Sequence, residues 1–322
     1  MSLPEIIKDN TTLPVIGSPL FIISNPKLVV EQCKAGIVGA FPALNARPAE
    51  KLDEWLTTIK QELAAYREQN PGAKVAPFAV NQIVHPSNDR LEQDMAVCVK
   101  HKVPIIITSL HSPTEVVKAA HSYGGLVFHD VTNVKHAKKA LSVGVDGLIL
   151  VTAGAGGHAG TINPFALLSE IRQFYDGTII LGGSITQGNH VLSAEVMGAD
   201  LAYMGTRFIA THEANADEAY KQMVVDSSAS DIVYSNLFTG VHGNYLRGSI
   251  ENVGLDPDNL VESDKSKMKI GSKGSAKGKA WRDVWGAGQG VGNITAVAYT
   301  ADVVGQLQEE YAEARHKLCK VC

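Results

Sequence analysis

Residues 147–160 read Gly-Leu-Ile-Leu-Val-Thr-Ala-Gly-Ala-Gly-Gly-His-Ala-Gly, and this stretch decides the fold class. Its first half is short and almost wholly apolar, which is typical of a strand buried on both faces of a parallel sheet. Its second half is a glycine-rich loop that carries one imidazole, His158. A buried strand that runs into such a loop predicts an α/β protein whose ligand site lies where the strands end.

Seven further apolar runs share this character, and amphipathic stretches separate them. The runs cover residues 15–20, 36–41, 75–81, 103–109, 126–131, 178–182 and 201–204. Apolar residues at spacings of three and four predict helices over 49–69, 114–123, 135–143 and 189–197. Eight strand–helix units predict a (β/α)₈ TIM barrel, and a doubly wound open sheet is the alternative.

The strand–helix rhythm stops after the eighth run. A helix is predicted over 213–225, and residues 231–290 follow with many Gly, Asn, Ser and Asp but few apolar periods. A last helical pattern over 294–315 returns to cap the barrel as its final helix. We therefore predict a barrel made of 1–212 and 291–322, with a smaller lid or substrate subdomain, 213–290, over its mouth. The lysine-rich part, 263–279, is expected to be a solvated loop and the most mobile segment.

Composition excludes several classes of protein. The 322 residues are 45% hydrophobic and 19% charged, so a large core is available. The net charge of -4 argues against a nucleic-acid partner. No apolar stretch is long enough to span a membrane, and the first residues lack a signal pattern, so we expect a cytoplasmic protein without a membrane partner.

Metal and disulfide chemistry find little support in the sequence. The 11 histidines are scattered, and none has carboxylates at ligand spacing, so no metal site is expected. Four cysteines are too few for a disulfide framework in a chain of this length. Cys319 and Cys322 form a C-x-x-C pair, which we interpret as part of a frayed tail.

Glycine-rich turns follow the seventh and eighth strands, and they are the strongest ligand signal. One reads Gly182-Gly183-Ser184 and the other Met204-Gly205-Thr206. Backbone N–H groups of paired turns at these two strands form the recurrent phosphate site of barrels. The turns therefore predict a phosphorylated ligand, without saying whether it is a cofactor or a substrate.

Other strand ends supply weaker candidates. Asn81 ends the third strand and could bond the edge of a heterocycle. His129 and Asp130 are neighbours near the end of the fifth strand. Because successive strand residues point to opposite faces, at most one of them faces the mouth, and the pattern leaves open which one.

The three motifs of residues 152–160, 180–185 and 197–208, with the tail 285–292, resemble the nitronate monooxygenase family, formerly called 2-nitropropane dioxygenases. The resemblance covers nearly the whole chain. It implies a barrel with non-covalent FMN. By that resemblance the FMN contacts are Pro19, Leu20, Asn81, Gly156, Gly157, Gly182, Gly183, Met204, Gly205 and Thr206. His158 matches the active-site histidine.

The resemblance also has departures. Many relatives carry Gln where this chain has Val151 and an acidic residue near Ala155, and some quinone-reducing relatives carry Lys where it has Asp130. The implied activity is oxidation of an alkyl nitronate or nitroalkane by dioxygen to a carbonyl compound and nitrite. His158 would then act as an imidazolium partner of the anion or as a general base.

Three alternatives remain open, and the sequence leaves the oligomeric state undefined. An FMN-dependent NAD(P)H reductase of a quinone or an enoyl thioester would use the same cofactor site. A cofactor-free isomerase or lyase would use the same turns for a phosphorylated substrate. A non-catalytic binding barrel would leave His158 without a task.

Overall fold

The computed structural model describes residues 3–263 and 283–320. The lysine-rich segment predicted to be mobile lies outside the described residues, apart from Ser263. The same holds for Cys322, one half of the C-x-x-C pair. Cys33 and Cys98 are free and buried, and Cys319 is free and exposed.

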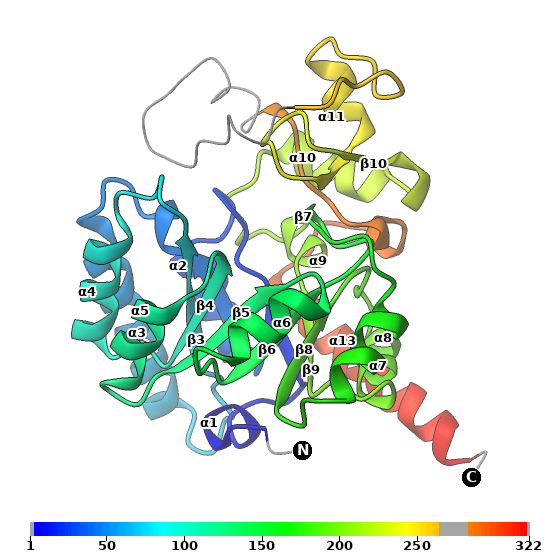
Figure 1. Cartoon of the computed structure of the whole chain (residues 1–322). Helices are drawn as coiled ribbons and strands as arrows, with labels where there is room; N and C mark the ends of the chain where they lie inside the picture. The colour runs from blue at the N-terminus through cyan, green and yellow to red at the C-terminus, as the bar shows by residue number, and fades with distance from the viewer. Residues whose placement is uncertain (1–2, 264–282, 321–322) are drawn as a thin grey trace.

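Eight parallel strands form the barrel, in the order in which they occur along the chain (Figure 1). They are β1 (Val15–Gly17), β2 (Gly39–Pro42), β3 (Phe78–Val84), β4 (Ile105–Leu110), β5 (Leu126–Val131), β6 (Gly147–Val151), β8 (Thr178–Gly182) and β9 (Leu201–Met204). The amide of Gly17 donates to the carbonyl of Val38, and the amide of Val38 donates to that of Val15, which joins β2 back to β1. The predicted (β/α)₈ barrel is thus confirmed, and the open sheet is excluded.

All eight predicted strands are present, with shifts of a few residues at some ends. β5, β8 and β9 have the predicted bounds, whereas β2 and β3 each begin three residues later than predicted. The shift at β3 arises because Val75 and Ala76 are buried but lie in the connection before the strand. Burial alone made the apolar run look longer than the hydrogen-bonded ladder.

Helices surround the barrel on the outside (Figure 1). They are α2 (Pro26–Lys34), α3 (Lys51–Gln69), α4 (Leu91–His101), α5 (Thr114–His121), α6 (Val134–Leu141), α7 (Pro164–Arg172), α8 (Gly188–Val196) and α13 (Thr300–Cys319). The short helices α1 (Glu5–Lys8) and α9 (Thr206–Ile209) lie at the two ends of the barrel strands. Helix α13 packs on α8 and α2, where the eighth outer helix of a barrel belongs.

Three of these helices, α2, α4 and α7, were not among the predicted ones. Two of them begin with a recognisable cap: Asn25 accepts from the amide of Leu28, and Asn163 accepts from the amide of Phe165. In both cases proline follows as the first helical residue. The pattern Asn-Pro is therefore the start signal that the apolar spacing alone did not reveal.

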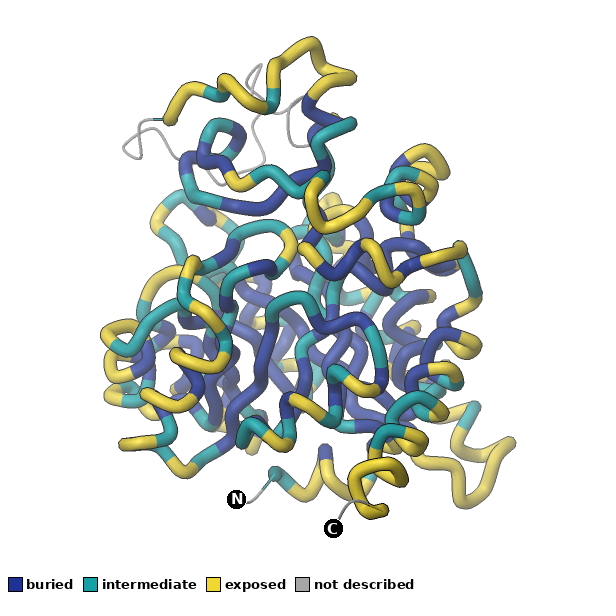
Figure 2. Tube along the Cα trace, turned by 90° about the vertical axis from the view of Figure 1, so that its right-hand side faces the viewer, coloured by how far each residue is buried: buried dark blue, intermediate teal, exposed yellow. Residues whose placement is uncertain are grey.

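The buried side chains form two layers on opposite faces of the strands. Ile105, Ile107, Phe128, Ile149 and Ile180 are among those that fill the barrel interior. The residues between them on each strand point outward and pack under the helices. Figure 2 shows this as a dark central region with exposed residues along the outer helices. Because both faces are apolar, a polar residue on a strand needs a special position.

A second, smaller sheet lies beyond the carboxyl ends of the barrel strands (Figure 1). It contains β7 (Gly157–His158), β10 (Ile232–Ser235) and β11 (Gly243–Leu246), and α10 (Glu218–Asp226) and α11 (Arg247–Asn252) accompany it. Phe238, Tyr245, Ile250 and Val284 are buried together there, so this region has a small core that its sequence pattern did not indicate. The division at 212/213 and 290/291 stays a prediction.

In the described part of the chain, no helix is both long enough and apolar enough to cross a membrane.

Gly188 and Gly305 give a matched test of the packing between α8 and α13. A Cβ at Gly188 would fall on the backbone of Leu307 and Tyr311, whereas a Cβ at Gly305 meets nothing within 4 Å. We expect Gly188→Ala to destabilise the protein by about 1–3 kcal/mol through overpacking. We expect Gly305→Ala to stabilise it by about 0.5–1 kcal/mol, because alanine costs less entropy in a helix.

Chemical denaturation of both variants beside the parent chain measures this difference. Equal free energies of unfolding for the two variants would contradict the predicted contact between the helices.

Candidate active site

A polar layer lies at the carboxyl end of the barrel interior, above the apolar filling. Phe128 of β5 points into the interior, so Asp130, two residues on, has the same orientation. The same spacing places Ser109 above Ile107 on β4, and Asn81 above Ala79 on β3. His129 faces the outer layer instead, where its Nδ1 lies 2.8 Å from the Thr108 hydroxyl. The question left open by the strand pattern is thus answered: Asp130 faces the mouth.

Hydrogen bonds join three of these side chains into a chain. The Asn81 amide donates to the Ser109 hydroxyl over 2.9 Å, and that hydroxyl donates to Asp130 Oδ2 over 2.6 Å. Asn81 also donates to the carbonyl of Ile107 over 3.3 Å, which fixes the orientation of its amide because a carbonyl only accepts. Asn81 therefore donates to Ser109, and Ser109 in turn donates to Asp130.

Asp130 occupies an unusual electrostatic environment. Burial raises the pKa of its carboxyl to about 7, and the hydrogen bond from Ser109 opposes that rise only partly. Tyr203 of β9 faces the same interior, and both burial and the proximity of Asp130 raise the pKa of its phenol well above 10. The mouth thus holds a carboxyl group that is protonated in a large fraction of molecules near neutral pH.

The glycine-rich loop after β6 connects the barrel to the small sheet. Within the barrel it is anchored by Thr152, whose amide and hydroxyl both donate to the carbonyl of Gly182. At its far end Gly157 and His158 form β7, which pairs with Asn244 and Gly243 of β11. The loop therefore positions His158 from both sides.

Thr239 determines the tautomer of His158. The Thr239 hydroxyl donates to the carbonyl of Val241 over 2.7 Å and accepts from the amide of that residue over 3.0 Å. Since its single hydrogen is used, the Thr239 oxygen accepts from His158 Nε2, which lies 3.0 Å away. The proton of the neutral ring then resides on Nε2.

His158 is a neutral imidazole at physiological pH. Burial lowers its pKa to about 4. This favours the general-base role over the imidazolium role, because an imidazolium would be rare above pH 5.

The turns after β8 and β9 form a cluster of amide donors. The two strands are neighbours, with Gly182 opposite Tyr203. Within the described residues, the amides of Gly183, Ser184 and Gly205 donate to no protein acceptor. Gly183 and Ser184 have positive φ values of 142° and 56°, a backbone shape that turns successive N–H groups outward. The residues thus fit a bound anion such as a phosphate.

The structure brings most of the other predicted contacts to the same place. The Leu20 side chain lies 3.2 Å from where a Cβ of Gly205 would stand. A Cβ at Gly156 would lie 3.1 Å from Thr206 Oγ1. Pro19, next to Leu20, lies in the same turn after β1. Asn81 belongs to the polar layer, and Gly157 borders open space, because a Cβ there meets nothing within 4 Å.

Two predicted contacts need qualification in their chemistry. The Met204 side chain is fully buried in the outer core, so only its main chain faces the site. The Thr206 hydroxyl accepts from the amide of Gly288 over 2.9 Å, which gives it a structural task. Gly183 likewise has a structural reason to be glycine, since a Cβ there would run into Thr152.

Residues 286–290 lie against the amide cluster; the sequence analysis placed them in the predicted lid subdomain and in the tail of the resemblance, but it assigned no contact to any one of them. Gly288 bonds Thr206, and the amide of Gln289 donates to the carbonyl of Gly154 over 2.9 Å. The sequence analysis also did not predict Ser109, Tyr203 and Thr239 as residues of the site. The alternation of side chains along a strand could have identified Ser109 and Tyr203. No sequence pattern could have identified Thr239, because it lies 81 residues from its partner His158.

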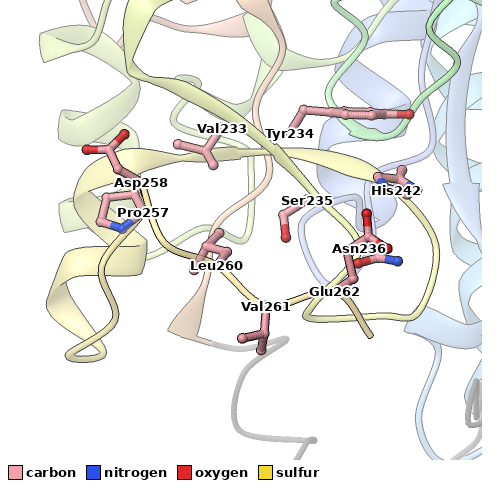
Figure 3. Close-up of a pocket in the computed structure, with 10 residues that line it drawn as sticks. All are labelled: Val233, Tyr234, Ser235, Asn236, His242, Pro257, Asp258, Leu260, Val261 and Glu262. Atoms are coloured by element: carbon pink, nitrogen blue, oxygen red, sulfur yellow. The ribbon is translucent and has the colours of Figure 1, made fainter. Parts of the chain in front are cut away.

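Figure 3 shows a pocket of about 250 Å³ on the small sheet, away from the polar layer of the barrel. Tyr234 and His242 stack at its edge, with ring centroids 5.0 Å apart. Among the described residues, no group of three or more His, Cys, Asp or Glu side chains could hold a metal ion.

Comparisons with known proteins agree with this architecture. The family model described as nitronate monooxygenase matches residues 30–310. A nitronate monooxygenase of Paraburkholderia phytofirmans is 23% identical, over 95% of this chain and 94% of its own length. Among solved structures, FabK from Thermotoga maritima superimposes with a TM-score of 0.77 at 21% identity, covering 99% of this chain and 98% of its own. A nitroalkane oxidase from Streptomyces ansochromogenes gives a TM-score of 0.75 at 23% identity, covering 97% and 99%.

Gly205 allows a test of the anion site with two variants of the same shape. It immediately precedes α9, and Asp and Asn at this position differ in charge but hardly in shape. We expect Gly205→Asp to bind FMN at least about tenfold more weakly than Gly205→Asn. Two like charges about 4 Å apart repel by about 1–4 kcal/mol in water or near a protein surface.

Titration of each apoprotein with FMN, followed by flavin fluorescence, measures the two affinities. Equal dissociation constants would place the phosphate elsewhere.

Proposed function

Because the chain belongs to the nitronate monooxygenase family, we propose that it oxidises alkyl nitronates with dioxygen to a carbonyl compound and nitrite, with FMN as cofactor. When bound, FMN supplies the electron-accepting chemistry that amino-acid side chains lack. The protein then has to hold the phosphate, orient the ring and manage one proton of the substrate.

The amide cluster is the part of the site that would hold the cofactor. Gly183, Ser184 and Gly205 offer N–H groups that have no acceptor among the described residues, at the strand ends where barrels bind phosphate. Asn81 lies across the mouth and offers an amide group to the edge of the ring. Binding at both ends would lay the ring over the polar layer.

The amide cluster is the observation that carries the cofactor part of the proposal, and a neutral imidazole on the neighbouring loop extends the proposal to neutral nitroalkanes. The loop that contains His158 approaches Thr206 at Gly156 and is bonded to the small sheet at β7. A nitronate is already deprotonated and needs no base. A neutral nitroalkane must first lose its α-proton, and the neutral imidazole of His158 is a group of the type that accepts such a proton.

Anaerobic reduction of the bound flavin separates this function from its rival. We expect an alkyl nitronate to bleach the visible flavin absorbance of the FMN-loaded protein, and nitrite to appear once oxygen is admitted. NADH and NADPH should leave the spectrum unchanged over the same time.

Rapid bleaching by either dinucleotide, with none by the nitronate, would overturn the proposal in favour of an NAD(P)H-dependent reductase. A protein that takes up no flavin at all would point to the cofactor-free isomerase or lyase.

His158→Gln tests the proposed base. We expect kcat/KM on a neutral nitroalkane to fall by about 10²–10⁴-fold, the usual contribution of general-base catalysis, while kcat/KM on the matching nitronate changes little. Because burial lowers the pKa of His158 to about 4, the parent enzyme should have no break due to this group between pH 6 and 9.

Thr239→Val is the matched control. It removes the acceptor of the Nε2 proton but retains the imidazole, so activity on the nitroalkane should fall less than in His158→Gln. Equal losses on both ionic forms of the substrate in His158→Gln would remove the base role.

A further inference from the structure

Asp130 has a carboxyl oxygen that the described protein leaves unsatisfied. Its Oδ2 accepts from Ser109, but its Oδ1 is buried and has no hydrogen-bond partner among the described residues. An unpartnered buried oxygen is unfavourable, and more so when it is charged. Such a cost at the mouth of a barrel indicates a group that is completed by a ligand or by a proton.

Among the described residues, the surroundings of Asp130 offer it no compensating charge. On β5 and β6 the inward neighbours are Phe128, Ile149 and Val151, which are apolar. On β4 and β3 they are the neutral Ser109 and Asn81. Tyr203 of β9 is the titratable group that faces it within the described chain, and its phenol is uncharged. The carboxyl is therefore free to gain or lose a proton in response to charge brought by a ligand.

The position of Asp130 relates it to the cofactor rather than to the substrate. It belongs to the interior layer, and two hydrogen bonds connect it to Asn81, the proposed contact of the ring. His158 belongs instead to the small sheet beyond the strand ends. A ring held between the amide cluster and Asn81 would have Asp130 on its barrel side.

We propose that Asp130 couples reduction of the bound flavin to the uptake of a proton at the barrel mouth. This inference rests on the proposed function, because it needs a flavin above the polar layer. Electrons delivered to a ring held above the polar layer, by the substrate or by an electrode, would add negative charge there. The Asp130 carboxylate responds by taking one proton from solvent on Oδ1 and becomes a neutral acid.

The sign of the effect follows from electrostatics. Negative charge on the ring disfavours a neighbouring carboxylate, so the pKa of Asp130 rises when the flavin is reduced. Below about pH 7 the group is protonated in both redox states, and well above that it is ionised in both. Between the two pKa values, reduction takes up one additional proton for every two electrons.

The midpoint potential of the bound flavin, measured by spectroelectrochemistry between pH 5 and 9, tests this coupling. In the parent protein we expect the slope to steepen by one proton per two electrons from about pH 7 upward, over the window in which Asp130 titrates. In Asp130→Asn, which keeps the shape but cannot titrate, that extra slope should be absent.

Ser109→Ala gives a second, milder variant. It removes the donor that stabilises the carboxylate at Oδ2, so the steep segment should begin at higher pH than in the parent protein. This variant keeps the test decisive if Asp130→Asn binds FMN poorly.

The outcomes distinguish the two proposals. A protein that takes up no FMN would refute the proposed function and the coupling together. A flavin that binds and is reduced by the nitronate, with the extra slope retained in Asp130→Asn or with its onset at the same pH in Ser109→Ala as in the parent protein, would refute the coupling alone.

Discussion

Each strand of the barrel is buried on both faces, and that constraint determines where chemistry can occur. One face packs in the interior and the other under the helices, so a polar side chain within a strand can be satisfied only near the strand's carboxyl end. Asn81, Ser109 and Asp130 are located there, one layer above Ala79, Ile107 and Phe128. The polar layer therefore arises where inward-facing strand positions reach the mouth of the barrel.

The loop after β6 leaves the carboxyl end of the barrel, and it joins the barrel to the small sheet. It connects the two sheets directly, since Thr152 is bonded to β8 and His158 pairs with β11. The protonation state of His158 thus depends on the small sheet, which buries the ring and supplies Thr239. A change in how that sheet packs would act on the imidazole without altering the barrel.

Much of the fold could be read from the sequence, because buried parallel strands leave continuous apolar runs. The eight runs and the paired turns after β8 and β9 were of this kind. The features that the sequence analysis missed were of two kinds: helix starts marked by only two residues, and a core formed by residues far apart in the sequence. An Asn-Pro pair marks the start of helix α2 and of helix α7. The core of the small sheet consists of Phe238, Tyr245, Ile250 and Val284, which are too widely spaced in the sequence to show a periodic pattern.

The site also has a part that could be predicted from local sequence and a part that could not. The amide cluster was predictable because glycine-rich turns are local signals, whereas Asp130 required strand phase, and phase depends on which neighbour is buried inside the barrel. Once Phe128 is known to point inward, Asp130 must do so as well. The site then has N–H donors without acceptors among the described residues after β8 and β9, and a titrating carboxyl on β5. A ligand with a phosphate at one end and an electron-accepting ring at the other matches this polarity in one orientation only, because the reverse would bring the phosphate against the carboxylate.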